Sequence, residues 1–140
     1  MIIIKIIQLI VWSKPKAKYF LAAWIIIIIS VSSIPSIPTL KIHTAKAEIR
    51  LDYLIHICEY GLLALMAYLS FTGNDFKMNF KKSIIITISL ILFALLDEFH
   101  QKLIPGRAYN VNDIISNILG IFAALVFCIV VFRKIGQSYK

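Results

Sequence analysis

The sequence predicts an all-α protein: a four-helix transmembrane bundle with a short N-terminal interfacial helix. The first observation is composition, since the 140 residues are 60% hydrophobic with a mean hydropathy of +0.86, whereas soluble domains are roughly 45–50% apolar. The second is patterning, because four long apolar runs alternate with basic connections in the manner of membrane spans. The length suits one compact unit. We divide it into an interfacial, cytoplasmic segment (1–18) and a membrane domain (19–134).

The net charge of +8, from 15 Lys and Arg against 7 Asp and Glu, needs an explanation. In a soluble protein such an excess suggests nucleic-acid binding. Here the basic residues lie mostly between apolar runs, which is typical of juxtamembrane segments. The distribution therefore predicts a membrane protein that does not bind nucleic acid.

Residues 1–12 are apolar but too short to cross about 30 Å of hydrocarbon. Lys5 and Gln8 share one helical face, and Trp12 suits headgroup depth, so we predict an interfacial helix. The segment has neither a basic n-region nor a small-residue cleavage site. We therefore expect the first span to act as an uncleaved signal-anchor.

Each predicted span has a recognisable beginning or end. Pro35 and Pro38 follow the first span, and Pro105 with Gly106 breaks the chain after the third, since proline and glycine oppose helix. Asn112 is the predicted N-cap of the fourth span. The predicted spans are residues 19–34, 52–71, 83–97 and 112–132.

Polar residues gather at the ends of three spans. At the head of the second, positions i, i+4, i+7, i+8 and i+11 fall on one helical face and hold Asp52, His56, Glu59, Tyr60 and Leu63. A similar face on the fourth holds Asp113, Asn117, Gly120 and Ala124, whose small residues permit close helix packing. The end of the third carries Asp97, Glu98 and Gln101.

Topology predicts that these three sets converge. Ten of the 15 basic residues lie at the termini and in the second connection, and five lie in the first and third connections. The positive-inside rule then places both termini in the cytoplasm. The polar ends of the second, third and fourth spans share the outer face, where ionisable groups indicate a functional site.

The chemistry of this constellation is open to several interpretations. His56 is either a helix-end histidine bonded to Asp52 or an acid–base group. His56 and Glu59 have the i, i+3 spacing of metal ligands, and Glu98 with His100 can add ligands from the third span, but neither HExxH nor HxxxH occurs. Arg107 and Lys102 can instead neutralise the carboxylates. We therefore predict no metal and leave the cofactor undefined.

Asp97 and Glu98 are adjacent carboxylates that point about 100° apart on a helix. One can act as acid or base if it is desolvated, or both can bridge to Arg107 and clamp the loop. Arg107 follows a turn that aims it at the site, where it can hold phosphate or carboxylate. A structural salt bridge from Arg107 to Asp113 or Glu98 is the alternative.

Three aromatic residues fit an interfacial belt better than a site. They are Trp24, Tyr60 and Tyr109.

The assembled motifs resemble the VanZ-like family of small bacterial membrane proteins. The match runs from about Ser32 to Ala124 and includes a Ser-Ser element and a D-x-x-x-H-x-x-E-Y-x-x-L pattern. Its most distinctive block consists of Asp97, Glu98, Gln101, Pro105, Gly106, Arg107, Asp113, Asn117 and Gly120. Two residues depart from the family pattern. Tyr53 stands where members often carry Lys, which puts any anion contact by that Lys in question, and Ala124 stands where Gly is frequent.

The resemblance implies a multi-pass protein of the bacterial cell membrane, and a named member is linked to low-level teicoplanin resistance. Our leading hypothesis is a site that acts on, or binds, a cell-envelope lipid or lipid-linked precursor. The alternative is a non-catalytic binding or scaffold protein that modulates a partner enzyme or ligand access. The predicted catalytic residues are His56, Glu59, Asp97, Glu98, Gln101 and Arg107, and the predicted ligand-binding residues are Asp52, Tyr60, Asp113 and Asn117.

Overall fold

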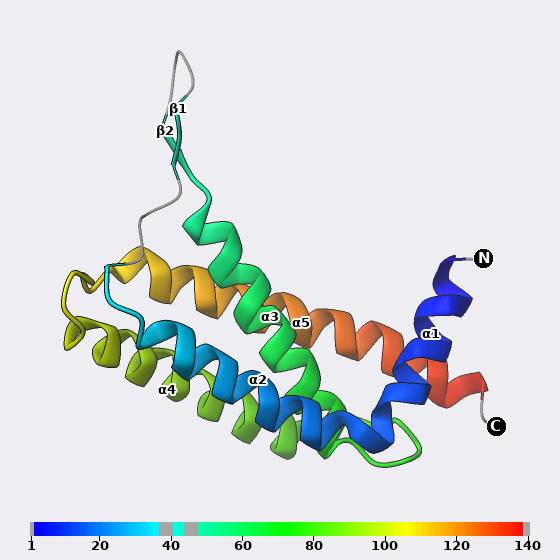
Figure 1. The fold of residues 1–140 in the computed structure, drawn as a ribbon. Coiled ribbons are helices and arrows are strands. Elements are labelled where there is room, and N and C mark those ends of the chain that lie inside the picture. The colour runs from blue at the N-terminus through cyan, green and yellow to red at the C-terminus, as the bar shows by residue number, and fades with distance from the viewer. Residues whose placement is uncertain (1, 37–40, 44–47, 139–140) are drawn as a thin grey trace.

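The computed structural model describes residues 2–36, 41–43 and 48–138. Its elements are α1 (Ile2–Ser13), a single 3-10 turn η1 (Lys14–Lys16), α2 (Ala17–Ser32), β1 (Lys41–His43), β2 (Glu48–Arg50), α3 (Asp52–Phe71), α4 (Phe80–Lys102) and α5 (Val111–Ser138) (Figure 1). Four helical stretches are long and apolar enough to cross a membrane: Ile7–Ser32, Asp52–Phe71, Phe80–Lys102 and Val111–Gln137. The all-α, four-span architecture is confirmed.

The helix boundaries agree with the sequence at the second span and differ elsewhere. Asn79 caps α4, since its side chain accepts from the Lys82 backbone N–H, so α4 begins three residues before the predicted position 83. It also continues to Lys102, which places Asp97, Glu98 and Gln101 on its last turns. α5 begins at Val111, and Asn110 rather than the predicted Asn112 accepts at its N-terminus, from the Asn112 backbone N–H.

The N-terminal segment forms a helix, as predicted. Ile10 of α1 is buried and belongs to the apolar core, and the first apolar stretch runs from Ile7 through η1 to Ser32. The end of α1 is therefore packed against the membrane domain and continues into α2 through η1, without an extended linker between them. The interfacial position of α1 stays a prediction.

The first connection contains a small hairpin where the sequence indicated only a polar linker. β1 and β2 pair antiparallel, with Lys41 opposite Arg50 and His43 opposite Glu48. The hairpin projects away from the helices (Figure 1). Its last residue, Arg50, leads directly into α3.

The crossing of α3 and α5 is the most extensive packing in the bundle. A Cβ on Gly120 would collide with the Ile57 carbonyl oxygen and would lie 2.9 Å from the Gly61 backbone nitrogen. Only glycine therefore allows the two backbones to approach this closely. Together with the buried Ala124, this confirms the predicted close packing and identifies Gly61 as its partner.

The two ends of the bundle differ in what they carry. Both termini lie toward one end, together with the α3–α4 connection, and the hairpin and the α4–α5 loop lie at the other (Figure 1). We call these the terminal end and the site end. The polar ends of α3, α4 and α5 meet at the site end, as the predicted topology requires.

Candidate functional site

The site end contains a cavity of about 520 Å³ between α2, α3, α5 and the α4–α5 loop. Six of the ten predicted site residues line it: Asp52, His56, Glu59, Gln101, Arg107 and Asp113. The other four, Tyr60, Asp97, Glu98 and Asn117, are buried and do not line the cavity. The sequence therefore predicted one constellation, and the structure divides it into cavity residues and supporting residues.

His56 bridges α3 and α5. Its Nδ1 lies 3.1 Å from Asn117 Oδ1 and its Nε2 lies 3.8 Å from Asp113 Oδ2. With Nδ1–H donating to the amide oxygen, Nε2 is the nitrogen that accepts or carries a second proton. The Asp113 carboxyl group lies close to that nitrogen, so the pair can pass a proton at the cavity wall.

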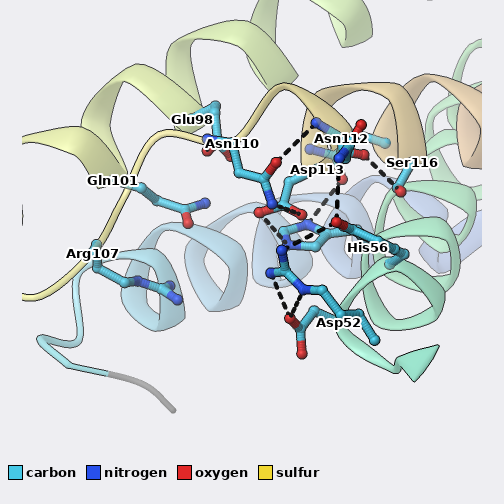
Figure 2. A network of polar contacts seen from close by, with 12 residues as sticks. Asp52, His56, Glu98, Gln101, Arg107, Asn110, Asn112, Asp113 and Ser116 are labelled. Carbon is cyan, nitrogen blue, oxygen red and sulfur yellow. Dashed lines mark hydrogen bonds and ion pairs between the residues drawn. The ribbon is translucent and has the colours of Figure 1, made fainter. Parts of the chain in front are cut away.

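The N-terminus of α5 holds Asp113 in place. The Asn110 side chain donates from Nδ2 to Asp113 Oδ1 at 3.0 Å, while its Oδ1 accepts from the Asn112 backbone N–H at 3.0 Å. Asn110 therefore caps the helix and fixes the carboxylate that faces His56. Figure 2 shows Asp52, His56 and Asp113 together on one side of the site, and Arg107 and Gln101 on the other.

Glu98 is fully buried on α4 and accepts the Asn110 backbone N–H at 2.7 Å through Oε1. It thereby clamps the α4–α5 loop to the helix that precedes it. The clamp was one of the two predicted roles, but its partner is a backbone amide rather than Arg107. Within the described part of the chain, Glu98 Oε2 has no hydrogen-bond partner.

Asp97 ties α4 to α3. Its Oδ2 accepts from the Tyr60 hydroxyl at 3.0 Å and from Gln101 Nε2 at 3.1 Å. Tyr60 is fully buried, so its prediction as an interfacial-belt residue is wrong. Trp24, which is half-buried, donates from Nε1 to the Glu59 backbone oxygen at 3.0 Å and so fixes α2 against α3.

Arg107 is aimed by the turn that precedes it, as predicted. Gly106 has φ +76°, and a Cβ there would collide with Ser36 Oγ, so only glycine fits. Arg107 Nη2 donates to the Val31 backbone oxygen at 3.3 Å. Among the described residues Arg107 forms no ion pair within 4 Å, so the predicted structural salt bridge to Asp113 or Glu98 is absent.

The C-terminal end of α2 and the residues after it contact the end of α4 and the α4–α5 loop, and α2 forms another part of the wall. Ser33 Oγ lies 3.0 Å from His100 Nε2, and the Ser36 backbone N–H donates to the Pro105 oxygen at 3.2 Å. The two adjacent serines, Ser32 and Ser33, therefore have different structural roles. Ser32 lines the cavity, and Ser33 holds His100.

Arg50 is a cavity residue that the sequence reasoning missed. Its Nε and Nη2 donate to Asp52 Oδ2 at 3.1 and 2.8 Å, and its guanidinium lies 4.7 Å from the Tyr53 ring centroid. The hydrogen bond that Arg50 donates to Asp52 raises the pKa of Arg50 above its ordinary value. Its position two residues before Asp52 was the available signal.

Arg50 also contacts Tyr53, whose hydroxyl accepts a hydrogen bond from Arg50 Nη1 at 3.1 Å. The cavity thus contains two arginines, Arg50 and Arg107, on different elements.

The described residues contain no group of three or more His, Cys, Asp and Glu side chains that could hold a metal ion. His100, a candidate ligand by spacing, is instead paired with Ser33. The arrangement offers two arginines, a histidine and the carboxyl group of Glu59. These groups suit recognition of an anion and proton transfer near it.

Comparison with protein-family models gives a match to the VanZ/LLP1 family over residues 12–133. Searches of curated proteins and of solved structures give no match. The family match covers well over half of the chain and contains all ten predicted site residues. The chain therefore belongs to the VanZ/LLP1 family.

Proposed function

We propose that this four-span membrane protein binds the anionic headgroup of a cell-envelope lipid or lipid-linked precursor in the site-end cavity. The observation that carries the proposal is Arg107, which lines a cavity of about 520 Å³ without an ion-pair partner among the described residues. A half-buried guanidinium without a carboxylate partner is a strong site for phosphate or carboxylate, because it can form bidentate charge-assisted hydrogen bonds.

The position and the lining of the cavity support the proposal that the ligand is a lipid. The cavity lies at the end of the membrane helices, and Val31 and Ile55 line it next to the polar residues. Such a boundary suits a molecule whose polar group enters the cavity while its chain stays in hydrocarbon. Arg50 supplies a second cation for the same headgroup.

We propose that His56 and Glu59 move protons or hydrogen-bond the bound headgroup, with Gln101 facing His56 from the other side of the site (Figure 2). The Glu59 side chain has no hydrogen bond within the described residues, so it is free to contact a ligand. Asp97, Tyr60, Asn117 and Glu98 position these groups from behind the wall.

We place the site end outside the bacterial cell membrane and both termini in the cytoplasm, because the basic residues favour that orientation. A membrane-impermeant maleimide on intact cells tests it, with Lys102→Cys at the site end and Lys81→Cys at the terminal end, both in a chain without Cys58 and Cys128. Labelling of Lys102→Cys alone is expected. Labelling of Lys81→Cys alone would reverse the orientation.

Binding is tested with purified full-length protein and two probes, a polyprenyl phosphate and the corresponding polyprenol. The phosphate is expected to bind at least tenfold more tightly. Arg107→Ala should weaken its binding by about tenfold or more, because a charge-assisted hydrogen bond contributes roughly 1.5–3 kcal/mol. The matched control is Lys102→Ala, an exposed basic residue of the same end that does not line the cavity. Equal binding of both probes, or equal effects of the two substitutions, would refute the proposal.

The non-catalytic alternative is favoured by the engagement of Asp97 and Glu98 in structural hydrogen bonds. His56→Gln and Glu59→Gln separate the two. These two variants should abolish acid–base chemistry on a bound lipid, measured as product by mass spectrometry, but only weaken binding.

A link to teicoplanin susceptibility is tested with the same variants in a glycopeptide-sensitive bacterium. If expression of the intact protein leaves the inhibitory concentration of teicoplanin unchanged, the protein has no such link.

A further inference from the structure

The terminal end has a groove of its own, about 630 Å³ in volume, between the beginning of α4 and the end of α5. Its walls are mainly apolar and include Phe80, Ile84, Leu125 and Phe132. None of the predicted site residues lines it. The volume falls within the roughly 300–1,000 Å³ of ligand pockets.

The groove is built into the fold. Phe76 adopts φ +53° in the α3–α4 connection, is buried, and packs edge-on against Phe132 with ring centroids 5.6 Å apart. Lys14 donates to the Leu69 and Thr72 carbonyl oxygens at 3.2 and 2.6 Å and so fixes the C-terminus of α3. The floor of the groove is therefore packed, whereas Phe80 and Ile84 on its α4 wall are 79% and 42% exposed.

Among the described residues, two cations and no acidic side chain line the groove. Arg133 on α5 and Lys77 on the connection are both exposed. Arg133 has no ion pair among the described residues. Lys77 has only a loose contact, with its Nζ 3.7 Å from Asp75 Oδ2 and its side chain 74% exposed.

We propose that this groove binds an anionic phospholipid of the leaflet at the terminal end, with an acyl chain between α4 and α5 and the phosphate on Lys77 and Arg133. An apolar wall alone would accept any lipid, so the two cations provide the selectivity. Basic pockets between membrane helices recognise anionic headgroups through this combination. The site does not depend on the function proposed for the cavity at the opposite end.

Native mass spectrometry of the full-length protein in neutral detergent tests the proposal with phosphatidylglycerol and phosphatidylcholine of identical chains. Each basic residue contributes on the order of a fivefold preference, so phosphatidylglycerol should bind at least tenfold more tightly. The double variant Lys77→Gln, Arg133→Gln should lose most of this preference. The control Lys18→Gln, Lys134→Gln removes the same net charge from exposed positions outside the groove and should retain it. Equal binding of the two lipids, or equal losses in the two double variants, would overturn the proposal.

The acyl chain is tested separately. Ile84→Trp should fill the groove and reduce phosphatidylglycerol binding, whereas Ile88→Trp, on the same helix but outside the groove, should not. Glycerol phosphate without acyl chains should compete poorly. If it competes as well as the lipid, or if Ile84→Trp binds normally, the site is not a lipid groove.

Discussion

The two ends of the bundle are built on different principles. At the site end, carboxylates and amides from separate elements hold one another through short hydrogen bonds, such as Glu98 with Asn110 and Asp97 with Tyr60. At the terminal end, basic side chains such as Lys77 and Arg133 are exposed around an apolar groove. A preorganised site can orient a headgroup and transfer protons, whereas an apolar groove with exposed cations can select a lipid by its acyl chain and its charge.

The crossing of α3 and α5 is the most extensive packing in the bundle, and the largest expected effect therefore comes from breaking it. Gly120→Ala should destabilise the protein by about 1–3 kcal/mol or more, because the new Cβ meets backbone atoms that cannot move aside. Gly61→Ala adds the same methyl group on the other helix, at an ordinary distance of 3.4 Å from the Gly120 oxygen, and should be tolerated. Unfolding in mixed micelles measures both. Equal stabilities would show that the crossing adjusts easily.

The second prediction distinguishes a clamp from a catalyst at Glu98. Glu98→Ala should destabilise the protein by about 1–3 kcal/mol, because the partly buried Asn110 N–H loses its acceptor. It should also increase hydrogen exchange in residues 103–112. Glu98→Gln keeps an acceptor oxygen and should behave almost like the intact protein. If the glutamine variant keeps its fold but loses all function, Glu98 is an acid or base rather than a clamp.

The third prediction compares two buried tyrosines of α3. Tyr60→Phe should lower stability by about 1–2 kcal/mol, since its hydroxyl donates to a carboxylate. Tyr68→Phe removes a hydroxyl that contacts Thr87 Oγ1 at 2.7 Å, a neutral partner, and should cost about 1 kcal/mol or less. Only Tyr60→Phe should also weaken headgroup binding, because Asp97 then loses one of its two anchors. Equal effects on binding would mean that Asp97 does not position the cavity wall.

Much of this architecture follows from the sequence because it rests on periodicity and charge. Helical spacing put His56 and Asp113 on inward faces, and the shared end of three spans predicted their convergence. The alternation of apolar runs and basic connections set the number of spans. The turn at Gly106 could be predicted from the sequence, because proline restricts the backbone of the preceding residue and glycine permits a positive φ.

The remaining details depend on tertiary partners, which no local pattern contains. Nothing in the spacing of Glu98 shows that a backbone amide 12 residues later is its partner. Tyr60 was predicted to lie at the membrane interface because the sequence does not show its partner. Packing against α4 and a hydrogen bond to Asp97 bury it instead. Arg50 was overlooked because it precedes the periodic segment and reaches the cavity only through the hairpin.

Arg50 offers the smallest expected effect on stability and the clearest separation of stability from function. Surface ion pairs contribute about 0–1 kcal/mol, and the Arg50–Asp52 pair is only partly buried, so Arg50→Ala should change the unfolding midpoint little. Its pKa is raised by Asp52, so the stability from this pair is lost only as pH rises through a value above the ordinary arginine pKa. Between pH 5 and 9 the small effect should therefore not vary with Arg50 ionisation.

The same substitution should weaken binding of a polyprenyl phosphate severalfold, since it removes one of two cations from the cavity, and Arg50→Lys should restore part of the loss. This is the reverse of Glu98→Ala, which should act on stability first. A stable Arg50→Ala protein with unchanged phosphate binding would leave Arg107 as the sole anion contact. It would also show that Arg50, at the hairpin end of α3, does not contribute to binding of the phosphate headgroup.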